Sequence, residues 1–138
     1  MTSVEWARFA DLSPYVLYSA LRLRIAVFAV EQHCVYQDLD GRDLEPATWH
    51  GWVADGDDVV AYLRILDDTV IGRVVTSPSA RGRGLGRLLM TSALERCARP
   101  VRIEAQTYLL DWYAAFGFVP RGPEYLEDGI PHTPMVLR

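Results

Sequence analysis

Residues 81–86 (RGRGLG) combine three glycines and two arginines directly before an apolar helical pattern. Glycine has no side chain, so its backbone amides can approach an anion closely. A helix that begins here would present free N–H groups and the positive end of its dipole to the same anion. The segment therefore predicts a pyrophosphate site, to which arginine side chains add charge-assisted contacts. Its residues are Arg81, Gly82, Arg83, Gly84, Leu85, Gly86 and Arg87.

Two common phosphate-binding motifs do not account for this segment. The dinucleotide fingerprint GxGxxG would need a third glycine at position 87 or 89, where the sequence has Arg87 and Leu89. The P-loop ends in Gly-Lys-Ser/Thr, and the sequence contains no lysine. A glycine-rich turn between a strand and a helix, without a ligand, is the alternative interpretation.

Two motifs resemble signatures of the GNAT N-acetyltransferase superfamily. Residues 81–86 resemble its R/Q-x-x-G-x-G/A signature, and residues 112–118 (WYAAFGF) resemble its later aromatic-Tyr-x-x-x-Gly-Phe motif. The separation of the two motifs is also similar to that in the superfamily. The segments that resemble its ElaA-like subgroup are 27–32, 36–38, 71–75, 104–106 and 127–132, so the resemblance extends from about Leu17 to Met135.

The resemblance implies one domain over residues 1–138 with an α/β GNAT acyltransferase fold. In this fold a mixed, mostly antiparallel central sheet is flanked by helices, and splayed strands form the CoA cleft. It implies acetyl-CoA as the acyl donor and a primary amine as the acceptor. The implied cofactor contacts are residues 81–87, the backbone of Val74, Val75 and Thr76, and Gln106, which stands where many members carry an Asn. Tyr113 matches a Tyr that members place near the thioester sulfur.

Acyl transfer to an amine needs a base, an oxyanion site and a proton for the departing thiolate. The amine must lose a proton before it attacks the thioester carbonyl. A backbone amide near Val74 or Val75 would stabilise the oxyanion, and the Tyr113 phenol would protonate the CoA thiolate. Alternatively, Tyr113 is only an aromatic core residue. The candidate bases are Glu104 on its strand, Glu31, His33, Glu127, Asp128, His132, or a chain of waters.

Composition limits the other classes of function. With 138 residues and a net charge of −4, the chain fits one globular domain and not a general nucleic-acid binder. No apolar run approaches the ~20 residues of a membrane span, and no leader is evident, so we expect a cytoplasmic protein. The two cysteines form no CxxC pair, and Cys34 is interpreted as an inert thiol. The histidines lack metal-ligand spacing, so no metal site is expected.

The elements that must position these residues follow from periodicity and turn signals. The expected order is strand, helix, three antiparallel strands, helix, strand, short helix and two closing strands. Ser13-Pro14 predicts the start of the first helix, which should run for about four turns. The expected strands are 4–9, 49–54, 59–66, 69–76, 101–106, 119–125 and 134–137, and the later helices are 84–98 and 109–116. Residues 31–46 are expected as a loop, with a short helix inside it as the alternative.

Two arginines, Arg64 and Arg73, fall inside predicted strands. A charge there needs a partner, so each is expected either in a buried ion pair or in positioning the acceptor or cofactor arm. Two functions other than catalysis stay open. One is a CoA-binding regulatory module without turnover, and the other is a dimeric interaction protein that pairs through an exposed sheet edge. A homodimer is compatible with each interpretation.

Overall fold

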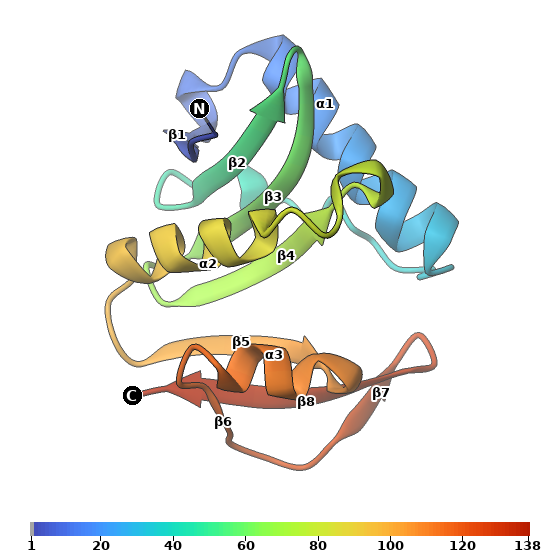
Figure 1. Cartoon of the computed structure of the whole chain (residues 1–138), viewed down its shortest axis with the longest axis vertical. Coiled ribbons are helices and arrows are strands. Elements are labelled where there is room, and N and C mark those ends of the chain that lie inside the picture. The colour runs from blue at the N-terminus through green and yellow to red at the C-terminus, as the bar shows by residue number, and fades with distance from the viewer. Residues whose placement is uncertain (1) are drawn as a thin grey trace.

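The sheet contains eight strands in the spatial order β1-β2-β3-β4-β5-β8-β6, and β7 pairs with β8 outside this path (Figure 1). The structure is a computed structural model that describes residues 2–138. Within these residues, neighbouring strands are antiparallel except β4 and β5. The strands are β1 (Glu5–Arg8), β2 (Trp49–Asp55), β3 (Asp58–Leu66), β4 (Val70–Thr76), β5 (Val101–Gln106), β6 (Val119–Pro120), β7 (Tyr125–Glu127) and β8 (Ile130–Leu137).

Three α-helices accompany the sheet: α1 (Pro14–Arg24), α2 (Leu85–Arg96) and α3 (Leu110–Ala114). The Ser13 side chain accepts a hydrogen bond from the Val16 amide at 3.1 Å, which confirms the predicted N-cap of α1. The helix does not end at Arg24 but continues as a π-helix over Ile25–Glu31. Short 3₁₀ segments occupy Phe9–Asp11, Arg42–Leu44, Pro78–Ala80 and Thr107–Leu109.

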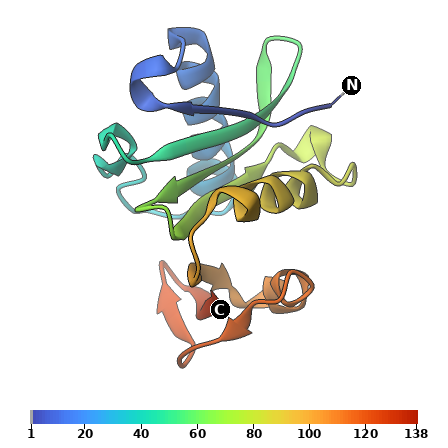
Figure 2. The ribbon, with the colours of Figure 1, turned by 90° about the vertical axis from the view of Figure 1, so that its left-hand side faces the viewer.

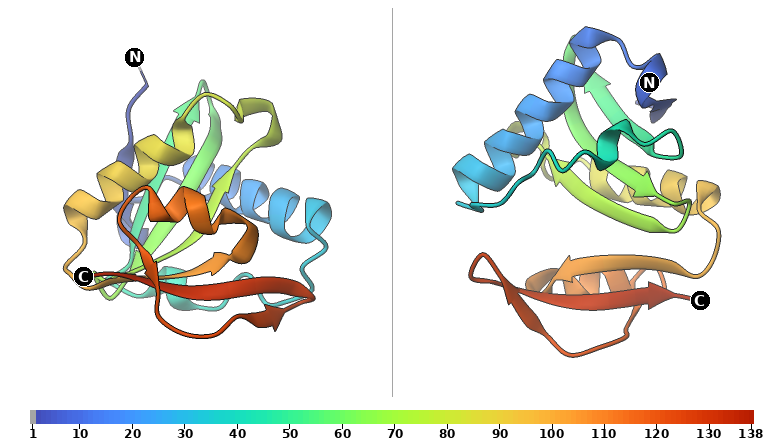
Figure 3. Two further views of the ribbon diagram at one scale, coloured as in Figure 1. Left: turned by 60° about the horizontal axis from the view of Figure 1, so that its bottom comes forward. Right: turned by 180° about the vertical axis from the view of Figure 1, so that it is seen from behind.

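Helices cover both faces of the sheet, as the turned views show (Figures 2 and 3). Apolar side chains of α1 and the π-helix, such as Leu23 and Val27, are buried in one cluster with Tyr62 and Val75. On the other face, Leu89 of α2 lies in a second, larger cluster with side chains from β3, β5 and β8. The sheet is therefore the middle of three layers, and the segments that join it to helices can meet at its edges.

The parallel pair β4 and β5 is joined at one position only. Val70 pairs with Arg102, and the Arg102 amide donates to the Thr69 carbonyl at 2.9 Å. Beyond this point the two strands diverge toward Thr76 and Gln106 (Figures 1 and 3). We call this divergence the splay. Backbone groups of β4 that face it have no ladder partner from β5, so they are available to a bound molecule.

A β-bulge interrupts β4 next to the splay. Tyr62 pairs with Val75 and Arg64 pairs with Gly72, so β4 has one more residue than β3 between these two pairs. Arg73, inside the bulge, has a φ of 54°. Such a conformation is uncommon for a residue that carries a β-carbon.

Most predicted elements are confirmed, and β5 has the predicted bounds. The strand predicted over 119–125 is wrong: β6 ends at Pro120, and β7 begins only at Tyr125. Pro120 and Pro123 have no N–H to donate to a ladder, which explains this break. The last strand begins at Ile130 and not at residue 134, because β7 and β8 form a hairpin around the turn at Asp128-Gly129.

None of the helices in the described part of the chain is long and apolar enough to cross a membrane.

Candidate active site

The predicted phosphate loop lies between the end of β4 and the start of α2. Gly82 and Gly84 have φ values of 83° and 75°, a region in which side chains are strained. Gly84 is the N-cap of α2 and provides no side-chain cap, and its carbonyl accepts from the Leu88 amide at 3.0 Å. The amides of the first helical turn therefore lack intrahelical acceptors. Free amides at the positive end of a helix dipole are the kind of group that can bind an anion.

Two of the three arginines of the loop, Arg81 and Arg83, already hold acidic partners. Arg81 donates to both carboxylate oxygens of Glu31 at 2.6 and 2.9 Å and to the Thr76 carbonyl at 3.2 Å. Hydrogen bonding to Arg81 lowers the pKa of the Glu31 carboxyl. Arg83 lies 3.4 Å from an Asp55 oxygen, and Arg87 is exposed. Glu31, which ends the π-helix, thus gives Arg81 the kind of contact that a phosphate would give it.

The backbone of Val74 and Thr76 faces the splay. The Ser77 amide donates to the Val60 carbonyl at 2.8 Å, so the backbone groups of Ser77 point toward β3. In an antiparallel ladder this direction alternates along the strand, so Val75 also faces β3 while Val74 and Thr76 face away from it. Two of the three predicted backbone contacts therefore have the right direction, and the Val75 side chain packs in the core under α1.

Tyr113 lies on α3 at the side of the phosphate loop. Its ring packs edge-on against Trp112 and Phe118, with centroids 4.9 and 6.2 Å away. Trp112 in turn covers Gly86, where a β-carbon would lie 3.3 Å from the indole ring. Tyr113 is 6% exposed, and burial together with the nearby Tyr108 phenol raises its pKa. It is a core residue, as the alternative interpretation held, and its hydroxyl stays protonated.

The predicted arm contact Gln106 lies at the end of β5. Its amide nitrogen donates to the Gln32 side-chain oxygen at 3.0 Å, which links β5 to the end of the π-helix across the splay. Sequence reasoning did not single out Gln32. Nearby, Cys34 is buried and burial raises the pKa of its thiol, which agrees with an inert cysteine.

The candidate bases occupy different surroundings. Glu104 receives a hydrogen bond from Arg121 at 3.0 Å and is 46% exposed. Burial, followed by the nearby Glu104 carboxylate, raises the pKa of Tyr125 to about 12. Across the β7–β8 hairpin, a Glu127 oxygen lies 3.8 Å from the His132 ring. Glu31 is held by Arg81 and His33 is exposed, so these groups are not brought together around one point.

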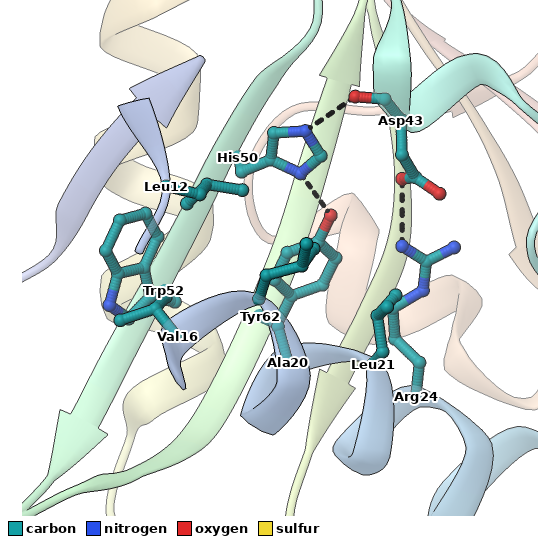
Figure 4. Close-up of a pocket in the computed structure, with 10 residues that line it drawn as sticks. Leu12, Val16, Ala20, Leu21, Arg24, Asp43, His50, Trp52 and Tyr62 are labelled. Atoms are coloured by element: carbon teal, nitrogen blue, oxygen red, sulfur yellow. Dashed lines mark hydrogen bonds and ion pairs between the residues drawn. The ribbon is translucent and has the colours of Figure 1, made fainter. Parts of the chain in front are cut away.

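A buried ionic cluster anchors the segment that follows the π-helix. Arg64 donates to Asp40 at 2.7 Å and to Asp43 at 3.1 Å. Arg24 of α1 donates to Asp43 at 2.8 Å (Figure 4). Arg24 and Arg64 are 1% and 3% exposed. The ion-pair interpretation of Arg64 and Arg73 is confirmed, since Arg73 binds the same segment through Asp38 at 2.8 Å.

His50 closes this cluster in a defined tautomer. Its Nε2 lies 3.0 Å from the Asp43 carbonyl, which can only accept, so Nε2 carries the proton. Nδ1 then accepts from the Tyr62 hydroxyl at 2.7 Å. Dashed lines mark both contacts of the His50 ring in the close-up (Figure 4). Burial lowers the pKa of His50, so the ring is neutral. The adjoining pocket has room for about one water molecule, too little for a substrate.

Asp43→Asn is expected to destabilise the fold by about 3 kcal/mol at pH 7, because Arg24 and Arg64 lose a buried counter-ion. Burial acts to raise the Asp43 pKa, but the two arginines outweigh it and lower the pKa. A lowered pKa stabilises the fold above the unfolded value of ~3.9, and this contribution disappears as the pH falls further. Urea unfolding from pH 7 to 3 should therefore show the variant approaching the parent in acid.

Glu45→Gln is the matched control, because Glu45 also pairs with an arginine, Arg42 at 3.0 Å, but both side chains are 40% exposed. We expect Glu45→Gln to lower the free energy of unfolding by ~1 kcal/mol or less. If Asp43→Asn and Glu45→Gln lower the free energy of unfolding equally, burial does not make the Asp43 ion pairs more important for stability.

The comparisons with known proteins agree with this geometry. A family model described as an acetyltransferase (GNAT) domain matches residues 19–138. Protein ElaA of Escherichia coli strain K12 is 46% identical over 147 residues, with 96% of this chain and 95% of ElaA covered. The crystal structure of an acyl-CoA N-acyltransferase from Pseudomonas aeruginosa has a TM-score of 0.93, 42% identity and full coverage of both chains. The E. coli ElaA crystal structure gives the same values. This chain belongs to the GNAT acetyltransferase family.

Proposed function

We propose that the protein transfers an acetyl group from acetyl-CoA to a primary amine. The observation that carries the proposal is the phosphate loop, whose free helix amides adjoin the exposed backbone of β4 at the splay. The pyrophosphate would lie on residues 81–87, and the pantetheine arm would follow the backbone of Val74 and Thr76 toward Gln106. The two cysteines are free, which fits the proposed location in the reducing cytoplasm.

The transfer would proceed by direct attack, without a covalent enzyme intermediate. A base removes a proton from the ammonium group, and the amine nitrogen then forms a bond to the thioester carbon. The carbonyl oxygen takes the electron pair as an oxyanion, which the Val74 amide stabilises. Collapse of this intermediate breaks the carbon–sulfur bond, and the nitrogen releases its second proton to water, from which Tyr113 later regains the proton that it gives up. The products are the amide and CoA, whose thiolate receives a hydrogen bond and then the proton from Tyr113.

The surroundings of Tyr113 suit this role in one respect and limit it in another. Burial keeps the phenol protonated, so it can donate at any physiological pH. Its raised pKa also makes it a weaker acid than a free tyrosine, so stabilising the leaving thiolate by a hydrogen bond would precede complete proton transfer. A water chain that ends at Glu104 or Glu127 is the proposed path for the amine proton.

The first experiment is calorimetric titration of the purified protein with acetyl-CoA, desulfo-CoA, NAD and ATP. We expect both CoA species to bind and NAD and ATP to bind weakly. An amine panel with a thiol assay for released CoA then tests turnover. Binding of CoA without release across the panel would favour the regulatory module, and absence of CoA binding would contradict the proposal.

Glu31→Gln is expected to raise the affinity for acetyl-CoA by up to about fivefold, because an exposed ion pair is worth at most ~1 kcal/mol. In the parent protein the pyrophosphate must displace Glu31 from Arg81, where both side chains are more than 40% exposed. The gain should shrink as salt is added. Asp55→Asn is the control, because its 3.4 Å contact with Arg83 is longer and more exposed. Weaker binding by Glu31→Gln would indicate that Glu31 instead holds the loop in its binding conformation.

A further inference from the structure

Arg73 combines a strained backbone with a tethered side chain. Its φ of 54° falls in the left-handed region, which glycine adopts freely and residues with a β-carbon adopt rarely. The preceding residue, Gly72, has no such φ, so the glycine of this strand is not the residue that makes the turn. Something other than local preference must therefore hold Arg73 in the bulge.

The side chain of Arg73 is held by the segment that follows the π-helix. Its Nε lies 2.8 Å from Asp38 Oδ1, and its terminal nitrogen donates to the Asp38 carbonyl at 3.1 Å. The same nitrogen lies 3.4 Å from Asp40, and the guanidinium carbon lies 5.3 Å from the centre of the Tyr36 ring. The contacts of the guanidinium thus converge on residues 36–40, through charge, hydrogen bonding and cation–π attraction.

Asp38 is itself fixed, so it can act as an anchor. The side chain is 6% exposed, and its Oδ2 accepts from Arg24 Nε at 3.0 Å. Arg24 also donates to the Asp38 carbonyl at 3.0 Å and is 1% exposed on α1. A buried arginine on the helix therefore holds Asp38 from one side, and Asp38 holds the bulge of β4 from the other.

The direction of the Val74 amide depends on the bulge. Without the extra residue, the alternation of the ladder would continue unbroken from Gly72 to Val75 and would change the direction in which Val74 faces. With the bulge, Val74 directs its backbone into the splay. The tethered residue, Arg73, therefore directly precedes Val74, the residue whose amide direction depends on the bulge.

We propose that Asp38 and Arg73 are positioning residues that hold the bulge of β4, so that the Val74 amide is aimed at the thioester carbonyl of a bound acyl-CoA. The inference rests on the proposed function, because it assumes that acyl-CoA lies in the splay. Neither side chain touches the reacting atoms. Their effect passes through the backbone of the bulge.

The matched variants are Arg73→Ala and Arg73→Gly. Both remove the tether, but alanine keeps the strain of a positive φ, whereas glycine adopts the same φ without it. The probe is acetyl-CoA with a ¹³C-labelled carbonyl, and its C=O stretch is measured by infrared difference spectroscopy at saturation. A hydrogen bond from Val74 should shift the stretch to lower wavenumber than in free acetyl-CoA. Arg73→Ala should lose most of this shift, and Arg73→Gly should retain most of it.

The outcomes separate the inference from the proposed function. Failure of the parent protein to bind acetyl-CoA would contradict the function itself. Binding without a carbonyl shift in the parent, or an equal shift in the parent and Arg73→Ala, would overturn the positioning role. Equal losses in Arg73→Ala and Arg73→Gly would overturn it too, since they would mean that the charge of Arg73 matters and its backbone does not.

A second pair keeps the test decisive if Arg73→Ala does not fold. Asp38→Asn removes the anchor charge and should lose part of the carbonyl shift, while Asp38→Asn combined with Arg73→Gly should regain it. A double variant no better than Asp38→Asn alone would contradict the inference. Urea unfolding of each variant shows that the comparison is made on folded protein.

Discussion

Tyr113→Phe should lower kcat for acetyl transfer about a hundredfold, within the range typical of a lost general acid. Burial keeps this phenol protonated, and phenylalanine removes its proton while it keeps the ring. The Tyr113 ring packs against Trp112 and Phe118, and a phenylalanine ring can make the same contacts, so stability and acetyl-CoA affinity should be nearly unchanged. Steady-state kinetics with an amine from the panel, together with calorimetry, measure the two quantities separately.

Tyr108→Phe is the control for this substitution. Tyr108 is a tyrosine near both Arg81 and Tyr113, but it is 74% exposed. It therefore tests the loss of a nearby phenol that is not buried. We expect its kcat to fall less than about threefold, as for a lost exposed hydrogen bond. An unchanged kcat in Tyr113→Phe would remove the general-acid role and leave Tyr113 as a core aromatic.

The parts of the fold that sequence predicted correctly depend on local chemistry. Ser13 and Pro14 define the start of α1 because capping needs only neighbouring residues. The turn residues between 55 and 58 and at Asp67-Asp68 define the three-strand meander for the same reason. The glycine loop between β4 and α2 was also predictable, because glycine spacing before a helix has a local meaning.

The parts that sequence could not predict depend on contacts between distant segments. Arg81 and Glu31 are 50 residues apart, and nothing in the sequence of either segment indicates that their side chains form an ion pair. Arg73 adopts a positive φ although Gly72 is its neighbour, because a tether 35 residues away in sequence holds it there. The pairing of Arg24 with two aspartates was equally hidden, since helical periodicity gives no reason to bury an arginine.

These hidden contacts share one location. The π-helix ends at Glu31 beside the phosphate loop, Gln32 reaches Gln106 on β5, and Asp38 reaches the bulge of β4. Residues 31–38 thus contact each of the three elements that border the splay. A single segment can therefore couple the proposed pyrophosphate site to the geometry of the proposed oxyanion site.

Gly84→Val should weaken acetyl-CoA binding about tenfold to a hundredfold, because a left-handed φ costs a residue with a β-carbon ~1–2 kcal/mol and a β-branched residue more. No atom lies within 4 Å of a β-carbon built on Gly84, so the effect is strain at φ 75° and not a clash. The variant would relieve that strain by turning the first amides of α2 away from the phosphate. Gly84→Asn should bind better than Gly84→Val, since asparagine tolerates this conformation. Gly41→Val has the same strain at φ 85° in open space on a different loop, and should leave affinity unchanged. If folded Gly84→Val binds acetyl-CoA as the parent does, the glycine loop is only a turn between β4 and α2.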